Sequence, residues 1–400
     1  MHSVGIIAEY NPFHNGHAYH IARAKELSGA DTAIVCMSAS FMQRGEPACL
    51  DKFARAKTAL LGGADMVIEL PDALSCACAE RFAYGGVRLL SATGLVNALA
   101  FGSECGDISA LKEAAALELN GEDMRAALSR GLSYPSAAAQ VMKEHGIALD
   151  ASAPNDVLAV EYIRKLNALA PHIEPIAVER VGAGYNDSTL DKADGFASAT
   201  ALRNAAQGGE ADALKGHVPD AVFECIKSEY ERGRFPADLE ELSPAILFAL
   251  RSLGAEGIAA LADVSEGLEN PLHRSALSSS GCYELLEAVK TRRYTLARLR
   301  RILCYALIGT TAQLQELAFK KEDALCIRVL GVRREKLHLL SELSKRASLP
   351  VVISASDIGA LSENTKTVLY HTGKAQLLHA LAFPKNRECT EDFSHALVTI

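Results

Sequence analysis

The sequence predicts an α/β protein whose first part, residues 1–207, holds a parallel sheet covered by helices, and whose second part, residues 208–400, is mainly helical. In the first part, short apolar runs alternate with stretches of helical periodicity, an order typical of parallel sheets. From about Gly208 onward the apolar runs fade and helical periodicity dominates. Polar and Gly-rich segments follow several of the apolar runs, and parallel sheets bind ligands at the carboxyl ends of their strands.

Composition and charge are those of a globular protein with more than one domain. The chain has 400 residues, 49% of them hydrophobic and 22% charged, and no apolar run is as long as a membrane span. Its start lacks a basic region followed by an apolar core, so we expect a cytoplasmic protein without a membrane partner. The ten Cys lack the spacing of a zinc site, and no metal ligands are assigned. The net charge of −8 does not indicate a DNA partner, although a local basic face is enough to hold phosphates.

The first strand and the first helix meet at a pair of histidines. The apolar run Val4–Ala8 predicts a buried strand, Asn11-Pro12 ends it, and helical periodicity follows up to a stop at Gly29. The sequence His14-x-Gly16-His17 lies at the start of that helix, where free N–H groups and the positive end of the helix dipole attract phosphate. The alternative is that the two polar side chains only cap the helix.

The next elements continue the alternation. We expect strands over residues 31–37, 64–71 and 97–104, with helices over 51–61 and 73–90 between them. Lys52 and Arg55 lie on one face at the start of the 51–61 helix, where cations oppose the helix dipole. We therefore expect them to contact RNA or phosphate, and the alternative is that they are solvated surface charges.

Three further positions follow strands or begin a helix. A helical insertion is expected over about residues 107–150, then a helix that starts within Ala153–Asp156 and runs to about Leu169, and a strand over 173–178. Gly102 can let a nucleotide lie against the backbone, or it can simply end its strand. Asn155 can contact a nucleotide, although a capping role is favoured. Arg180 directly follows the strand and is well placed for the phosphates or ribose of ATP.

A second phosphate-binding pattern lies near the end of the first part, in Ser198-Ala199-Thr200-Ala201-Leu202-Arg203. Ser198 is expected to be the N-cap of a helix. The hydroxyl groups of Ser198 and Thr200 and the guanidinium of Arg203 can face the same phosphate.

The second part contains the most basic segment of the chain, residues 290–301. Leu296 and Leu299 would anchor a helix here, and the guanidinium groups that would point outward belong to Arg292, Arg293 and Arg300. We expect this helix to face RNA, and the alternative is an ordinary amphipathic helix with solvated arginines. A short strand is expected late in this part, within residues 349–354.

The two phosphate-binding patterns resemble the paired signatures of the nucleotidylyltransferase superfamily, and the resemblance implies a Rossmann-like nucleotidylyltransferase domain. Other segments make the resemblance more specific. The chain is similar to the tRNA(Met) cytidine acetate ligase family in Glu9–His17, Gln43–Ala48, Phe101–Glu104, Pro154–Asn155, Arg180–Tyr185 and Ser198–Thr200. It departs from the family at Ala39-Ser40, where Gly-Asn is usual.

The resemblance implies an activity and a set of site residues. The enzyme would activate acetate with ATP as acetyl-adenylate and transfer the acetyl group to N4 of the wobble cytidine of elongator tRNA(Met). His14, His17 and Arg203 would stabilise the negative charge that develops during adenylation. Mg²⁺ is expected to accompany the triphosphate. The residues that would hold ATP are Ile7, Ala8, Glu9, Tyr10, Asn11, Pro12, Phe13, His14, Asn15, Gly16, His17, Ala18, Tyr19, His20, Gly102, Asn155, Arg180, Ser198 and Thr200.

Two other functions stay open on the sequence alone. One is a small-molecule adenylyltransferase that acts on a phosphorylated vitamin, but such an enzyme would leave the large second part unexplained. The other is a nucleotide-dependent RNA-binding protein without catalysis, against which the intact His-x-Gly-His argues.

Overall fold

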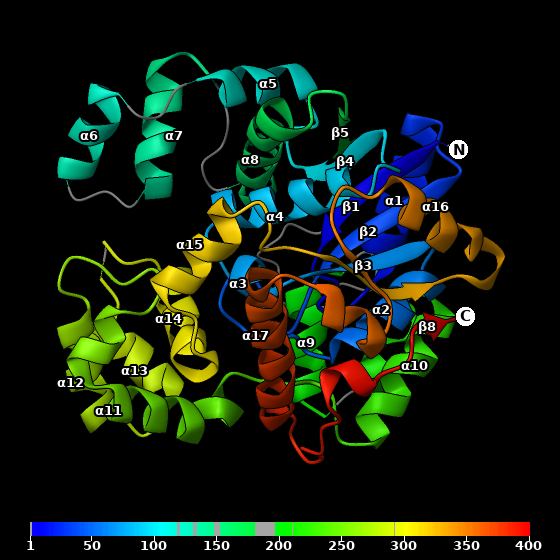
Figure 1. The fold of residues 1–400 in the computed structure, drawn as a ribbon. Coiled ribbons are helices and arrows are strands. Elements are labelled where there is room, and N and C mark those ends of the chain that lie inside the picture. Colours follow the sequence, from blue (N-terminus) through cyan, green and yellow to red (C-terminus); the bar gives the residue numbers. More distant parts are fainter. Residues whose placement is uncertain are drawn as a thin grey trace.

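One mixed sheet organises the molecule. The computed structural model describes residues 2–117, 121–130, 134–147, 153–180, 197–209, 211–291 and 293–400. Its sheet has eight strands, in the order β5-β4-β1-β2-β3-β6-β7, with β8 paired to β6 (Figure 1). All five strands expected in the first part are present: β1 (Ser3–Ala8), β2 (Thr32–Ser38), β3 (Met66–Leu70), β4 (Ala98–Ser103) and β5 (Glu174–Glu179).

The strand order reverses at β1. From β1 the chain adds β2 and then β3 on one side, and it later returns to add β4 and β5 on the other side; all four pairings are parallel. Connections on either side of such a reversal diverge and leave a crevice at the carboxyl ends of the strands. By this rule we expect the crevice between β1 and β4, with the segment after Ala8 and the segment after Ser103 at its two sides.

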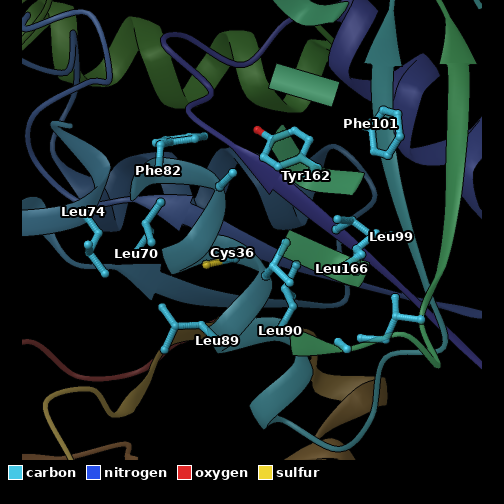
Figure 2. Close-up of a cluster of buried hydrophobic side chains, with 14 of the residues drawn as sticks. Cys36, Leu70, Leu74, Phe82, Leu89, Leu90, Leu99, Phe101, Tyr162 and Leu166 are labelled. Carbon is cyan, nitrogen blue, oxygen red and sulfur yellow. The ribbon is translucent and has the colours of Figure 1, made fainter. Parts of the chain in front are cut away.

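Helices bury both faces of the sheet. Ile34 and Cys36 of β2 belong to one apolar core, and Val35 and Met37 belong to the other, because successive side chains of a strand point to opposite faces. Figure 2 shows the first core, where α4 and α8 pack on the sheet. Burial on both faces explains why these strands are continuous apolar runs. The helices of the first part are α1 (Asn15–Ser28), α2 (Lys52–Leu61), α3 (Asp72–Ser75), α4 (Ala79–Ala92), α8 (Pro154–Leu169) and α9 (Ala199–Gln207).

The helical insertion expected over about residues 107–150 is present in the described residues. It comprises α5 (Ile108–Ala116), α6 (Glu122–Ser129) and α7 (Tyr134–Glu144). Arg164 of α8 joins α5 to the body of the protein, because its guanidinium donates to the carbonyl oxygens of Ala114, Ala115 and Leu117. Figure 1 shows α6 and α7 at the margin of the molecule, beyond α5 and α8.

The second part is mainly helical, as expected, but it also extends the sheet. The short strand β7 (Val351–Val352) lies within the range predicted for it, and two strands were not predicted, β6 (Ile327–Val332) and β8 (Val398–Thr399). Strand β6 runs antiparallel to β3. A division of domains at residue 207 stays a prediction. The helices are α10 (Asp220–Glu231), α11 (Ser243–Ala259), α12 (Glu269–Ser278), α13 (Cys282–Val289), α14 (Leu296–Ile308), α15 (Ala312–Lys320), α16 (His338–Arg346) and α17 (Glu363–His379).

A third apolar core joins α11–α14 to the first part. It includes Phe41 and Cys76 from the first part and Ala375 from α17. Figure 1 shows α17 between this group of helices and the sheet. In the described residues, one helix, Glu240–Ala259, matches a membrane span in length and apolar composition. Gly254 interrupts its helical geometry, with φ 61° and ψ −179°, and its apolar residues Ile246 and Leu250 are fully buried in this core.

Candidate active site

Both histidines of the first helix cap its N-terminus through one ring nitrogen each. His14 is the N-cap residue, and its Nδ1 accepts a hydrogen bond of 3.0 Å from Gly16 N–H. The Nδ1 of His17 accepts one of 3.2 Å from His14 N–H. A neutral imidazole that accepts at Nδ1 carries its proton at Nε2. Within the described part of the chain, neither Nε2–H has an acceptor, so capping leaves two N–H donors at the helix terminus.

The two imidazoles are neutral at physiological pH. Their rings stack, with centroids 3.7 Å apart and an angle of 25° between planes. Burial lowers the pKa of His14 to about 3, with a smaller contribution from Arg180. Burial also holds the pKa of His17 well below its usual range, and the neighbouring His14 adds to this. The pair therefore contributes hydrogen-bond donors, and positive charge comes from the helix terminus and from arginines.

The turn before the helix is held from several sides. Tyr10 adopts a left-handed φ of 47°, and the Asn11-Pro12 peptide bond is cis. The Tyr10 ring lies 4.8 Å from both the Phe13 and the His17 ring centroids, edge to face. The side-chain oxygen of Asn11 accepts a hydrogen bond of 2.6 Å from Cys49 N–H. These contacts fix where the first turn of α1 begins relative to the end of β1.

His20, Gly102 and Arg180 lie close to the carboxyl end of β4. The buried Nε2 of His20 has no partner among the described residues. Burial lowers the pKa of His20 to about 4. A Cβ atom added to Gly102 would meet Arg180 Cγ at 3.6 Å, an ordinary contact. Protein packing therefore does not require glycine at position 102.

Asn155 does not cap its helix, so the capping interpretation is wrong. The N-cap of α8 is Ala153, and Asn155 Nδ2 donates a hydrogen bond of 2.5 Å to Glu104 Oε1. The other oxygen of Glu104 accepts a hydrogen bond of 3.0 Å from Asp156 N–H. Buried Asp156 in turn accepts one of 2.5 Å from the Ser103 hydroxyl. Glu104 and Asp156, for which the sequence pattern predicts no role, tie the start of α8 to the end of β4.

The late phosphate-binding pattern meets the early one. Ser198 is the N-cap of α9 as expected, and its hydroxyl accepts a hydrogen bond of 3.0 Å from Ala201 N–H. Arg203 donates from Nη1 to the Asn11 carbonyl oxygen at 2.6 Å. Its Nη2 lies 3.4 Å from the Thr200 hydroxyl. The fold thus brings the start of α9 to the turn that carries His14, as the paired patterns predict.

Glu46 joins Arg203 to the helical part of the molecule. Its Oε2 lies 3.4 Å from Arg203 Nη2, and its Oε1 lies 2.5 Å from Arg300 Nη1 of α14. Neighbouring Gly45 has a φ of 76°, and a Cβ there would lie 2.2 Å from the backbone nitrogen of Arg301. The 41–47 loop therefore lies directly against α14. Part of this loop, Gln43–Ala48, carries the family resemblance, but the local sequence does not predict that Glu46 bridges Arg203 and Arg300.

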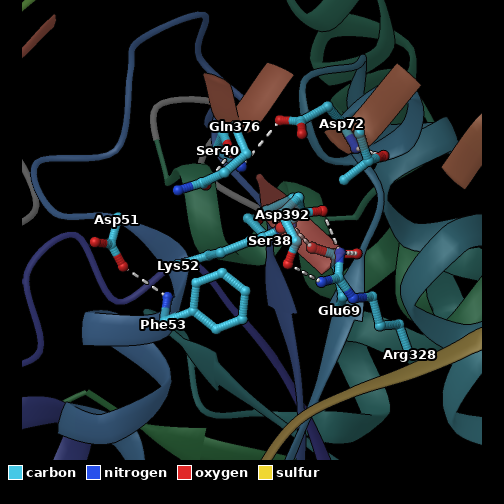
Figure 3. Close-up of polar contacts among 12 residues, drawn as sticks. Ser38, Ser40, Asp51, Lys52, Phe53, Glu69, Asp72, Arg328, Gln376 and Asp392 are labelled. Carbon is cyan, nitrogen blue, oxygen red and sulfur yellow. Dashed lines mark hydrogen bonds and ion pairs between the residues drawn. The ribbon is translucent and has the colours of Figure 1, made fainter. Parts of the chain in front are cut away.

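Lys52 is not an RNA-binding residue, and the expectation for it is wrong. Its side chain is fully buried, and its Nζ lies 2.5 Å from Glu69 Oε1 and 2.7 Å from Asp392 Oδ1. Arg328 pairs with the same two carboxylates, which closes a ring of four buried charges (Figure 3). Asp392 is distant in sequence and comes into contact only through the fold, so the local pattern made Lys52 look like a surface cation.

The same correction applies to Arg55, which is also fully buried. Its Nη1 donates to the carbonyl oxygens of Glu9 at 2.8 Å and Ser38 at 2.9 Å, and its Nε donates to Leu50 O at 3.2 Å. Arg55 therefore ties the carboxyl ends of β1 and β2 together. A buried guanidinium needs this many acceptors, because an unpaired one would be strongly destabilising.

Arg293 and Arg300 are the other predicted RNA contacts that the structure describes. Arg293 is exposed and pairs with Glu266 at 2.8 Å, and Arg292 lies outside the described residues. Arg300 is partly buried against Glu46.

Ala39 and Ser40 are fully buried, and Ser40 donates from its hydroxyl to Gln376 Oε1 at 2.9 Å. The departure from Gly-Asn therefore lies in the protein interior, at a contact with α17.

Comparison with known proteins adds three findings. A model of the HIGH nucleotidyl transferase family matches residues 1–392. The tRNA(Met) cytidine acetate ligases of Acetivibrio thermocellus and of Thermoanaerobacter sp. are 37% and 34% identical to this chain, with 89% and 100% of both chains covered. The crystal structure of Thermotoga maritima TmcAL bound with alpha-thio ATP is 32% identical, covers 100% of both chains and superposes with a TM-score of 0.90.

Proposed function

This chain belongs to the tRNA(Met) cytidine acetate ligase family of HIGH nucleotidyl transferases, and we propose that it uses ATP and acetate to acetylate N4 of the wobble cytidine of elongator tRNA(Met). The observation that carries the site assignment is the hydrogen bond from Arg203 to Asn11, in the turn that leads into the His14–His17 cap after β1. A structural neighbour with bound ATP analogue supports the use of ATP, and relatives aligned over their whole length support tRNA(Met) as the substrate.

In the first step, an acetate oxygen attacks the α-phosphorus of ATP, and pyrophosphate leaves. The two Nε2–H groups of His14 and His17 donate to the non-bridging oxygens of the α-phosphate, where negative charge grows in the transition state. Because both imidazoles are neutral and already fixed by their Nδ1 bonds, they need not reorganise during the reaction. Thr200, Ser198 and Arg203 serve the β- and γ-phosphates at the start of α9.

The rest of the nucleotide lies against β4 and α8. Gly102 leaves room at the backbone for the ribose or the base; Arg180 lies against Gly102, and Asn155 is hydrogen-bonded to Glu104 just after β4. Mg²⁺ supplies charge neutralisation when it accompanies the triphosphate. Among the described residues, no group of three His, Cys, Asp or Glu side chains could hold a metal ion, so the phosphates themselves would provide its anionic ligands.

The second step needs the anticodon loop at the same crevice. The cytidine N4 attacks the acetyl carbonyl carbon, and AMP leaves. Exposed Arg293, with Arg300 of α14 next to Glu46, would form part of the tRNA contact. The proposed reaction belongs to the cytoplasm, where tRNA is modified.

The test supplies ATP and radiolabelled acetate with one RNA at a time. Elongator tRNA(Met) should gain label at the wobble cytidine, and a transcript with uridine at that position should not. Acetate-dependent release of pyrophosphate should occur with or without tRNA. Pyrophosphate release that requires a phosphorylated vitamin would support the small-molecule adenylyltransferase instead, and ATP binding without turnover would support the non-catalytic protein.

A further inference from the structure

Glu9 places a carboxylate at the carboxyl end of β1, beside the proposed phosphate site. It follows Ala8, the last residue of β1, and precedes Tyr10, whose ring contacts His17. Arg55 fixes its backbone by donating to its carbonyl oxygen at 2.8 Å. Its Oε1 accepts a hydrogen bond of 2.7 Å from Gln43 N–H. Its Oε2 has no hydrogen-bond donor among the residues that the structure describes.

The family resemblance counts Glu9 among the residues that would hold ATP, but neither ATP binding nor loop packing accounts for its side chain. A carboxylate beside a triphosphate repels it, so its charge opposes the binding of ATP. The bond to Gln43 N–H anchors the 41–47 loop, but it uses one of the two oxygens. Burial is the largest influence on Glu9 and raises its pKa. The hydrogen bond from Gln43 N–H and the charges of Arg44 and Arg203 act in the opposite direction and favour the carboxylate anion, whereas Glu46 disfavours it.

We propose that the second oxygen of Glu9 accepts an N4–H of the target cytidine and takes its proton when acetyl-adenylate is attacked. This inference rests on the proposed function. The N4 amino group is the donor that distinguishes cytosine from uracil at this edge, and Asp and Glu are the side chains that accept from it. An anionic oxygen beside the oxygen at C4 of uracil is repulsive, so Glu9 would also select cytidine.

The step balances in atoms and charge. The N4 lone pair forms the new C–N bond at the acetyl carbonyl carbon, and the bond from that carbon to the phosphate oxygen breaks, so AMP leaves with the electron pair. The proton lost by N4 passes to Glu9 Oε2, which later releases it to solvent. The carboxylate touches the reacting nitrogen, whereas His14 and His17 contact the phosphate.

Glu9→Gln separates this role from loop anchoring. The amide oxygen of Gln can still accept from Gln43 N–H, whereas its NH₂ group would face the N4 donors and cannot take a proton. Transfer of acetyl to tRNA should fall about 100-fold or more, while acetate-dependent exchange of pyrophosphate into ATP without tRNA should fall by less than about tenfold. Glu113→Gln, at an exposed position of α5, removes the same charge and should change neither rate.

Binding of tRNA gives a second measurement that needs no turnover. The wild type should bind elongator tRNA(Met) about tenfold more tightly than the transcript with wobble uridine, and Glu9→Gln should abolish or reverse this preference. Equal losses in both half-reactions with an unchanged binding preference would overturn the proposal, as would normal transfer by the variant. A wild type that performs the exchange but never acetylates this tRNA would instead overturn the proposed function.

Discussion

Each histidine of the α1 cap uses one ring nitrogen for the helix terminus and has a second nitrogen without an acceptor among the described residues. The Nδ1 atoms accept from the backbone of the first helical turn, and this fixes the protons at Nε2. The alternatives of cap and phosphate ligand are therefore not exclusive. An Asn side chain can place an oxygen where Nδ1 lies, but it has no counterpart of Nε2–H, so substitution can separate the two roles.

His14→Asn should keep the cap and lose the donor. We expect thermal stability close to that of the wild type, whereas His14→Ala should lose about 1 kcal/mol through the missing cap. Both variants should slow acetate-dependent pyrophosphate exchange by about 100- to 1,000-fold, because each removes a donor to the α-phosphate. His172→Ala, at an exposed position, is the matched control. Full exchange activity in His14→Asn would show that this residue serves only the helix.

The low pKa of His14 has a consequence for stability. The pKa is about 3 in the folded chain and near 6.5 when unfolded, so between these values the unfolded state binds more protons and stability falls as pH falls. Between pH 7 and pH 5 the loss from this group should be about 2 kcal/mol. Urea unfolding should show His14→Asn losing less stability than the wild type over this interval. Equal losses of stability in the two proteins would mean that the pKa of His14 is the same in the folded and unfolded states.

At the scale of elements, the 41–47 loop connects the end of the sheet to α14 through contacts on both sides. It is held by Glu46 to Arg203 and Arg300, by Gln43 N–H to Glu9, and by the close approach of Gly45 to the α14 backbone. The loop thus touches both the proposed phosphate site and the helical part. Its position depends on a residue without a side chain at 45.

Gly45→Ala should displace this loop, whereas Gly29→Ala should not displace anything. Both glycines have similar left-handed φ values, 76° and 66°, so both substitutions carry a conformational cost of about 1 kcal/mol. Only at Gly45 would the added Cβ collide with a helix backbone. We expect a lower melting temperature and slower acetyl transfer for Gly45→Ala than for Gly29→Ala. Matching values for the two variants would show that the approach to α14 is not needed.

At the scale of the whole molecule, charges far apart in sequence hold the two parts together. Lys52 of α2, Glu69 of β3, Arg328 of β6 and Asp392 near the C-terminus form a buried ring between the sheet and the final segment (Figure 3). Two positive and two negative charges compensate one another. Removing one member leaves a buried charge without its partner.

Lys52→Met should therefore affect stability, whereas Arg293→Ala should affect tRNA binding. The first should destabilise the protein by about 3–5 kcal/mol in urea unfolding, because two carboxylates lose a buried cation, and should leave tRNA affinity unchanged in the folded fraction. The second should leave stability unchanged and weaken tRNA binding. The slope of log affinity against log salt concentration should fall by about one, which corresponds to one lost phosphate contact. Weaker tRNA binding by folded Lys52→Met would restore the RNA-binding interpretation that burial of Lys52 excludes.

Local physics made much of this protein predictable. A strand buried on both faces must be apolar throughout, so the segments around Val4–Ala8 and residues 31–37 were recognisable. Helix termini need side-chain acceptors, so Ser198 could be identified as a cap from its neighbours. The two patterns at the starts of α1 and α9 predict phosphate binding because anion sites at helix N-termini use few residue types at fixed spacing, and this role stays a prediction.

Tertiary structure decided whatever depends on distant partners. Lys52 is a buried ion-pair residue because Asp392 and Glu69 lie beside it, and Arg55 is buried because carbonyl oxygens from two strand ends converge on it. Strand β6 belongs to the sheet because β3 offers it an open edge. A cation has the same local pattern whether water or a distant carboxylate compensates its charge, and only the folded chain determines which of the two it meets.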